Sequence, residues 1–292
     1  VSSSKTLGSS APSLTLIANK NISINSAIDL HETGSKLQLS AGNVSSNGSI
    51  SFGATLNSDA ISIDLIGSGS ITQSIPITTN SLRINAQLAT ITLDNTSNQI
   101  GAIAANVQSL NIKNNQGVDK GSLYGSGMAV GVVGDLTGVT ATGDISMSVL
   151  NGNLFVDKSI TTASTSSTAL KLSAGSSLSI GSYSGTNSVN NPYGPNIILA
   201  NDFSSTSQSI SVGSGGTGLL FTGGYGNSGL SLATYLGSNK SRYNSNESTT
   251  NFSTAVGTGL TAIYRQNPSM IVTGPSASTT YGTAATFGTN SI

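Results

Sequence analysis

The sequence has no cysteine and no tryptophan, and only one histidine, His31, in 292 residues. The absence of cysteine excludes a disulfide scaffold, a thiolate metal site and a cysteine nucleophile. Charged residues are scarce as well. They make up 8% of the chain, against about 25% in an average soluble domain. The 11 Lys and Arg residues are scattered and form no basic stripe that would neutralise phosphates. We therefore expect no nucleic-acid binding.

Long apolar runs are missing too. No stretch approaches the ~18 residues of a membrane span, so we expect no membrane insertion. The chain opens Val1-Ser2-Ser3 without a signal peptide, so we expect either that a signal peptide was removed or that the chain is an internal fragment of a secreted protein. What the chain does have is 35 Gly and many Ser, Thr and Asn residues. Short aliphatic clusters recur among them, which favours an ordered β protein over a disordered chain.

An imperfect internal repeat, apolar-x-apolar-x-small, runs along the chain. Its copies begin at Leu14, Leu37, Ile61, Leu82, Leu110, Leu170 and Ile198. A second, shorter apolar-x-apolar strand follows most copies, at Ile22, Ile50, Ile71, Ile91, Leu178 and Ile210. The first copies are 23, 24 and 21 residues apart (14 to 37, 37 to 61 and 61 to 82). Alternation with period two predicts strands with one inward face, and the Gly, Asn, Asp and Ser between them favour turns.

These features predict an all-β fold, a right-handed parallel β-helix with ~20–28 residues per coil. Coils stacked about 4.8 Å apart would share one narrow aliphatic core. At ~22 residues per coil the chain would form roughly 13 coils. A β-sandwich is the alternative fold, because it also has many short strands. It is disfavoured because hairpin signals are rare and restricted to Asn47-Gly48 and Asn151-Gly152.

Several phrases resemble the filamentous-haemagglutinin-like exoproteins of two-partner secretion and similar autotransporter passengers. They are the Asn-rich turn and hydrophobic-Gly-Ala strand of residues 91–103 and the Leu-x-Leu-x-Ala-Gly phrases at 37–42 and 170–175. The resemblance covers roughly residues 10–215. It implies a right-handed parallel β-helix on a bacterial surface, with a role in adhesion, in aggregation or as a stalk. The Asn-Pro-Asn-Gly-Ile secretion motif of the family does not occur.

We assign residues 1–262 to the β-helix and expect Gly-rich, irregular excursions from it at 115–144 and 213–260. Residues 263–292 are interpreted as a linker and the start of a possible Ig-like repeat. The phrase Thr280-Tyr-Gly-Thr283 resembles the opening of the small Ig-like repeats that follow such β-helices.

No catalytic, metal or cofactor site is predicted. His31 lies in Asp29-Leu-His-Glu32, the densest polar cluster, but the chain has no second histidine for a metal site. We therefore interpret it as a solvated turn. Sugar cleavage would need carboxylates about one coil apart, and Asp135 and Asp157 have that spacing. A polysaccharide-active enzyme therefore stays an alternative, although we expect a protein that is not an enzyme and has no cofactor.

The predicted function is mechanical display and adhesion by a secreted or cell-surface bacterial protein, as in an extracellular matrix or biofilm. The expected partners are glycans, a host or other cell surface, or other copies of the chain associated into fibres. A self-assembling extracellular filament subunit is a second alternative. Tyrosine serves well at interfaces, and the candidate surface-binding residues are Tyr183, Tyr193, Tyr225 and Tyr235.

Overall fold

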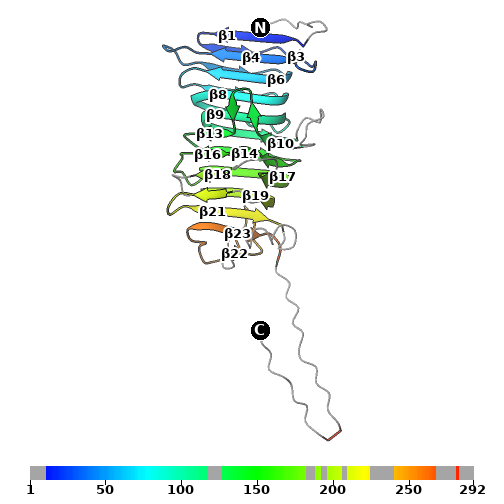
Figure 1. Ribbon diagram of the computed structural model, residues 1–292, viewed down its shortest axis with the longest axis vertical. Coiled ribbons are helices and arrows are strands. Elements are labelled where there is room, and N and C mark those ends of the chain that lie inside the picture. Colours follow the sequence, from blue (N-terminus) through cyan, green and yellow to red (C-terminus); the bar gives the residue numbers. More distant parts are fainter. Residues whose placement is uncertain are drawn as a thin grey trace.

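The computed structural model describes residues 11–116, 127–181, 188–191, 196–205, 209–223, 240–267 and 281–282. Within these ranges the regular structure is all β, and no helix occurs. Parallel strands stack into a β-solenoid of about eight turns, which gives the rod in Figure 1. The predicted parallel β-helix is thus confirmed. Its turns are fewer than the roughly 13 expected from ~22 residues per coil, because some coils are much longer. Leu110 stacks directly on Ile145, 35 residues later.

Column A is the first of three strand columns, and as far as β9 (Gln99–Asn114) each coil contributes one strand to it. These strands are β1 (Ser13–Ala18), β4 (Lys36–Ala41) and parts of three long strands, β6 (Leu56–Leu65), β8 (Ile77–Leu93) and β9. The parts that belong to column A are residues 60–65 of β6, 81–86 of β8 and 102–107 of β9. The register places Leu14, Leu37, Ile61 and Leu82 over one another, as the repeat spacing predicted.

Beyond β9, column A divides into two half-columns. One contains β10 (Met128–Val130), β15 (Leu154–Val156), and the ends of β17 (Leu170–Ile180) and β19 (Asn196–Ser205). The other contains β13 (Val139–Ala141), β16 (Ile160–Thr162), β18 (Ser188–Asn191) and β20 (Ser209–Val212).

Column B runs almost the whole length of the rod. It contains β2 (Asn21–Ile24), β5 (Ser49–Phe52), β7 (Ser70–Gln73), residues 90–93 and 109–114 of β8 and β9, β14 (Ile145–Val149), the first halves of β17 and β19, β21 (Thr217–Thr222) and β23 (Gly259–Tyr264). The predicted second strands at Ile22, Ile50, Ile71 and Ile91 stack here in register. The repeat copies at Leu110 and Leu170 also belong to column B.

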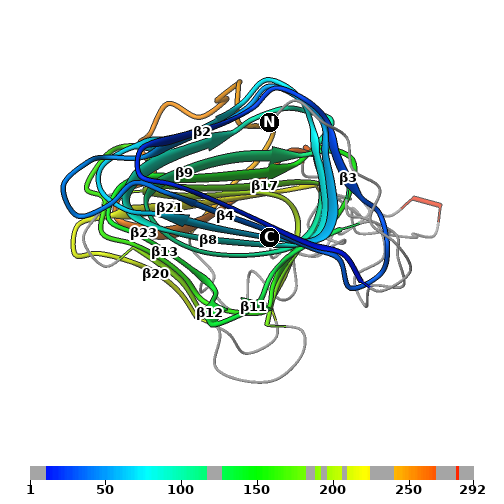
Figure 2. The ribbon, with the colours of Figure 1, turned by 90° about the horizontal axis from the view of Figure 1, so that it is seen from above.

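Column C is short. It contains β3 (Ile28–Leu30) and the first residues of β6, β8 and β9. Seen along the rod axis, the columns form separate walls around one interior (Figure 2). Inward side chains fill that interior in ladders. Leu39, Ile63 and Ile84 lie in one such ladder and are completely buried.

The expected excursion at 115–144 is smaller in the structure than the sequence suggested. Residues 117–126 lie outside the described ranges, but β10 and β13 continue the solenoid against β9. Between them projects an antiparallel hairpin of β11 (Val132–Val133) and β12 (Leu136–Thr137). The repeat is hard to see here because the hairpin interrupts what would be a single strand of column A.

The excursion expected at 213–260 also contains stacked strands, namely β21 and the start of β23. The solenoid continues through β23 to Tyr264, so the boundary placed at 262 falls inside a strand. The short strand β22 (Ser241–Arg242) pairs with β23 on the side opposite β21. Although it precedes β23 in sequence, β22 therefore lies beyond it along the rod.

Candidate functional site

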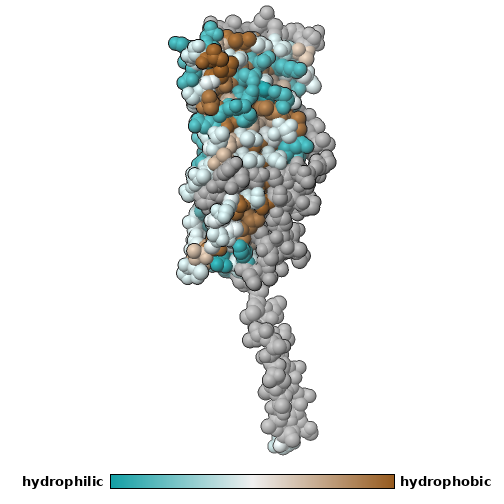
Figure 3. Space-filling model, turned by 60° about the vertical axis from the view of Figure 1, so that its left-hand side comes forward, coloured by the Kyte–Doolittle hydropathy of each residue, from teal (hydrophilic) through white to brown (hydrophobic). Residues whose placement is uncertain are grey.

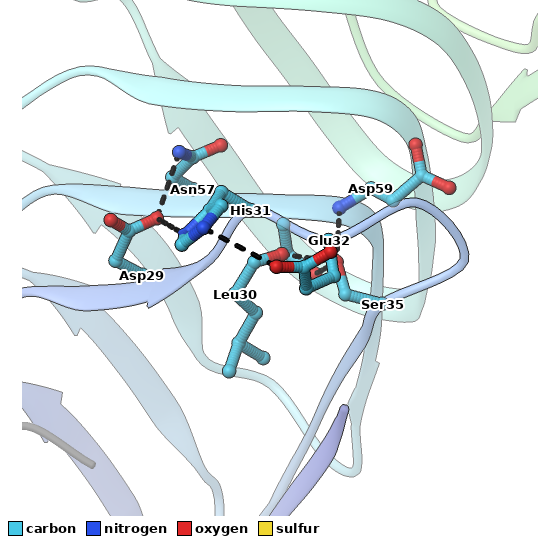
Figure 4. Close-up of polar contacts among 8 residues, drawn as sticks. Asp29, Leu30, His31, Glu32, Ser35, Asn57 and Asp59 are labelled. Carbon is cyan, nitrogen blue, oxygen red and sulfur yellow. Dashed lines mark hydrogen bonds and ion pairs between the residues drawn. The ribbon is translucent and has the colours of Figure 1, made fainter. Parts of the chain in front are cut away.

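The single histidine lies on the turn that leads from column C to column A (Figure 4). His31 Nδ1 is 3.5 Å from an Asp29 carboxylate oxygen, and its Nε2 is 3.5 Å from one of Glu32. The imidazole is 60% exposed. Beside it, the Ser35 hydroxyl accepts the backbone N–H of Asp59 at 2.9 Å and ties two coils together. This is a solvated polar turn, and no cluster of His, Cys, Asp or Glu suited to a metal ion occurs in the described residues.

The outer surface of column B carries two parallel rows of small polar side chains, here called the hydroxyl face. One row contains Asn21, Ser49, Ser70, Thr90 and Ser109, and the other Ser23, Ser51, Thr72, Thr92 and Asn111. Neighbours in a row are one coil apart, about 4.8 Å, and the rows are about 6.6 Å apart because they alternate with buried residues. The hydroxyl face is therefore a regular array of hydrogen-bonding groups without charge.

Some of these hydroxyls also bond to one another along the rod axis. Ser51 donates to Ser23 at 3.2 Å, and Ser109 donates to Thr90 at 3.3 Å. The sequence concealed this order because Ser, Thr and Asn exchange freely within a row. Only the register between coils reveals that they align.

Asp144 begins the next coil of column B and ends the uncharged stretch. Burial alone would raise the pKa of its carboxyl group, but hydrogen bonds from Ser164, Ser166 and Thr168 outweigh that effect and lower it. Ser166 donates at 2.7 Å and Thr168 at 2.9 Å. The charge of Asp144 is therefore held by hydroxyl groups of the segment that precedes β17 in the neighbouring coil.

A second polar region lies where the β11–β12 hairpin covers column A. In Figure 1 the hairpin stands along the rod axis in front of β8 and β9, and Figure 2 places it outside the column A wall. Ala104 points outward from β9 but is completely buried. The neck of the hairpin is closed by the Gly138 N–H, which donates to the Gly131 carbonyl at 2.8 Å.

Arg83 fastens the tip of this hairpin to the rod. Its guanidinium forms a two-pronged ion pair with Asp135 of the hairpin, one prong being 3.1 Å, and a further pair with Asp64 at 2.7 Å. These carboxylates raise the pKa of Arg83, Asp135 having the largest effect. Arg83 in turn lowers the pKa of Asp135. Sequence reasoning missed this group, because Arg83 and Asp135 are 52 residues apart and no local signal links them.

The hairpin and column A enclose a cleft of about 430 Å³. The column A side is lined mainly by residues from three successive coils, among them Lys36, Gln38, Ser62 and Arg83, and the hairpin side by Val133 and Gly134.

Exposed aliphatic side chains lie at the end of column A or in the turn between columns A and B in each of the first four coils. They are Ile17, Val44, Ile66 and Leu88, exposed by 77%, 98%, 44% and 60%. Figure 3 shows apolar side chains gathered on the N-terminal part of the face that it presents.

The four tyrosines predicted as surface-binding residues, Tyr183, Tyr193, Tyr225 and Tyr235, lie outside the described residues. Asp135 and Asp157, which have the spacing of stacked acids, occupy different settings. Asp135 is exposed on the hairpin, whereas Asp157 is buried after β15. Within the described part of the chain, no helix is long and apolar enough to cross a membrane.

Comparison with protein-family models, with curated proteins and with solved structures gave no match to this chain. The fold therefore rests on the stacking of its own strands, and the resemblance to filamentous-haemagglutinin-like exoproteins stays a prediction.

Proposed function

We propose that this chain is a rigid, non-catalytic rod from a secreted or cell-surface bacterial protein, and that its hydroxyl face adheres to polysaccharide surfaces. The observation that carries the proposal is the register of column B, which aligns small polar side chains in two rows over five coils. A regular array of this kind can form many weak hydrogen bonds with the regularly spaced hydroxyls of a polysaccharide. Because side chains held by stacked coils lose little further entropy, such bonds can add up.

The charge distribution fits the same role. The chain has no net charge, and the two rows contain no ionisable residue. Attraction to a charged surface would weaken with salt, because exposed charges are screened beyond about 10 Å at ~0.1 M ionic strength. Hydrogen bonding between neutral groups lacks this dependence. We therefore expect adhesion that is insensitive to salt.

The non-catalytic part of the proposal is supported by the two acids that share Arg83. Asp64 and Asp135 both bind Arg83, but sugar cleavage needs one carboxyl group that stays protonated near neutral pH. Arg83 lowers the pKa of Asp135, which is the opposite shift. The pair is better suited to holding the hairpin than to acid catalysis.

Co-sedimentation of the purified chain with particulate cellulose and chitin tests the adhesive proposal. We expect Thr92→Lys to weaken binding at least about fivefold, because a long charged side chain would hold a polysaccharide surface away from the rows. Thr78→Lys is the matched control, since Thr78 lies on the outer surface of column C. Equal binding by the two variants, or no binding by the parent chain, would refute the role of the hydroxyl face.

Self-assembly into fibres is a second candidate, favoured by the exposed aliphatic side chains of the first four coils, Ile17, Val44, Ile66 and Leu88. Contiguous exposed apolar surface often marks a contact between proteins. Sedimentation velocity over a range of concentrations, with Val44→Ser as the variant, would distinguish it. Concentration-dependent association that Val44→Ser abolishes would support side-by-side assembly, and a monomer at all concentrations would exclude it.

A further inference from the structure

We infer that the cleft beneath the β11–β12 hairpin is a binding site for an acidic saccharide, whose carboxylate pairs with Lys36. This site is separate from the hydroxyl face, and it adds recognition of soluble, charged sugar chains to the proposed adhesion. Its volume of about 430 Å³ lies within the ~300–1,000 Å³ of typical small-molecule sites.

The β11–β12 hairpin forms one wall of the cleft and is held in place at both its neck and its tip. It is inserted into a column A strand, where insertions on one face of a solenoid often form the binding face. Its neck is closed by backbone hydrogen bonds, and its tip is fixed by Asp135 on Arg83. A Cβ atom on Gly134 would lie 3.2 Å from Cδ of Arg83, so the tip rests closely on the arginine stem. The wall is therefore in place before any ligand arrives.

The opposite wall offers hydrogen-bonding groups that have no partner among the described residues. The register places Ser13, Lys36, Ala60 and Ser81 in one row and Gln38, Ser62 and Arg83 in the next. The amide of Gln38 and the hydroxyls of Ser13 and Ser81 form no side-chain hydrogen bond within the described chain. The free side chains of Ser13, Gln38 and Ser81 are spread along the rod axis from β1 to β8 and suit the ring hydroxyls of a linear saccharide.

The charges in the cleft determine the class of sugar. Arg83 is already satisfied by Asp64 and Asp135, so it is not free to bind a second anion. Lys36 has no carboxylate partner within the described chain, and it lies two coils from Arg83, on the column A wall that faces the hairpin. The group formed by Arg83, Asp64 and Asp135 keeps one negative charge, because one guanidinium is shared by two carboxylates. The Lys36 ammonium is then the cation of the cleft that is available to a carboxylate, as in a uronic acid.

Isothermal titration calorimetry with trigalacturonic acid, and with cellotriose as the neutral analogue, tests this inference. We expect trigalacturonic acid to bind more tightly than cellotriose. Lys36→Gln should weaken its binding about fivefold, the effect of losing one exposed ion pair. Lys171→Gln is the control, because Lys171 is exposed on column B. NMR amide shifts on titration should centre on residues 36–38 and 133–134.

No binding of trigalacturonic acid, equal binding by the parent chain and Lys36→Gln, or equal affinity for cellotriose would each overturn the inference. These results are separable from failure of the proposed function. Thr92→Lys should bind trigalacturonic acid as the parent chain does, whereas Lys36→Gln should keep its adhesion to particulate cellulose and chitin.

Discussion

Asn114 offers a sensitive test of how the solenoid is held together. Among the described residues, column C ends at Ile100, and the Asn114 side chain takes the position in which a further strand would bond. Its amide oxygen accepts the Ile100 N–H at 2.9 Å, and its amide nitrogen donates to the Ile100 carbonyl at 3.0 Å. Both residues are completely buried. One side-chain amide thus replaces the hydrogen bonds of a peptide group.

The change Asn114→Ala would leave both Ile100 backbone groups without these partners. A buried polar group that loses its hydrogen bond costs about 1–3 kcal/mol, so the loss for the two groups is about 2–6 kcal/mol. The matched control is Asn111→Ala in the same strand. Asn111 points outward on column B, and surface changes of this kind usually stay within about 0.5 kcal/mol.

Urea unfolding followed by circular dichroism measures the loss of stability, and hydrogen exchange at the Ile100 amide locates it. We expect a lower urea midpoint for Asn114→Ala and faster exchange at Ile100, with neither change in Asn111→Ala. The reasoning would be refuted if Asn114→Ala lost less than about 0.5 kcal/mol, or if the Ile100 amide exchanged at the parent rate.

Three further outcomes are expected. Leu39→Ala should cost about 2–5 kcal/mol in urea unfolding, because a fully buried core side chain would leave a cavity; a smaller loss would mean that the narrow core can collapse. Gly138→Ala should lower the melting temperature, since φ is +71° and the new Cβ would lie 2.2 Å from a Ser159 oxygen; an unchanged melting temperature would contradict this packing. The hairpin contact should be complete at neutral pH and disappear as the pH falls through the lowered pKa of Asp135, below its ordinary 3.8. NMR shifts of residues 132–137 would follow it, and release already at about pH 5–6 would disprove the pairing with Arg83.

Much of the fold could be predicted because the positions of the aliphatic residues indicate both the length of each coil and which strand residues point inward. The spacing of Leu14, Leu37, Ile61 and Leu82 is the register that the structure adopts. The column of a strand was harder to predict. Leu170 has the same phrase as Leu37 but lies in column B, because every wall of a solenoid requires the same alternation of inward and outward residues.

The candidate sites were less accessible to sequence reasoning. The hydroxyl face depends on which Ser or Thr stacks on which, and this follows only from the lengths of the intervening turns. The cleft depends on Arg83 meeting Asp135 across 52 residues, after the hairpin has bent back along the rod. Neither arrangement produces a local motif, so composition indicated a polar, nearly uncharged surface without locating its binding groups.

The placement of β22 beyond β23 bears on the order in which the protein folds. Coils can be added one after another from the N-terminal end, each on the edge of the last. Residues 241–242, however, bond to β23 and must wait until residues 259–264 have docked on β21. Among the described residues, β23 thus enters between two segments that precede it in sequence. A chain still emerging from a ribosome or a secretion pore would keep the edge of β21 open until β23 has docked on it.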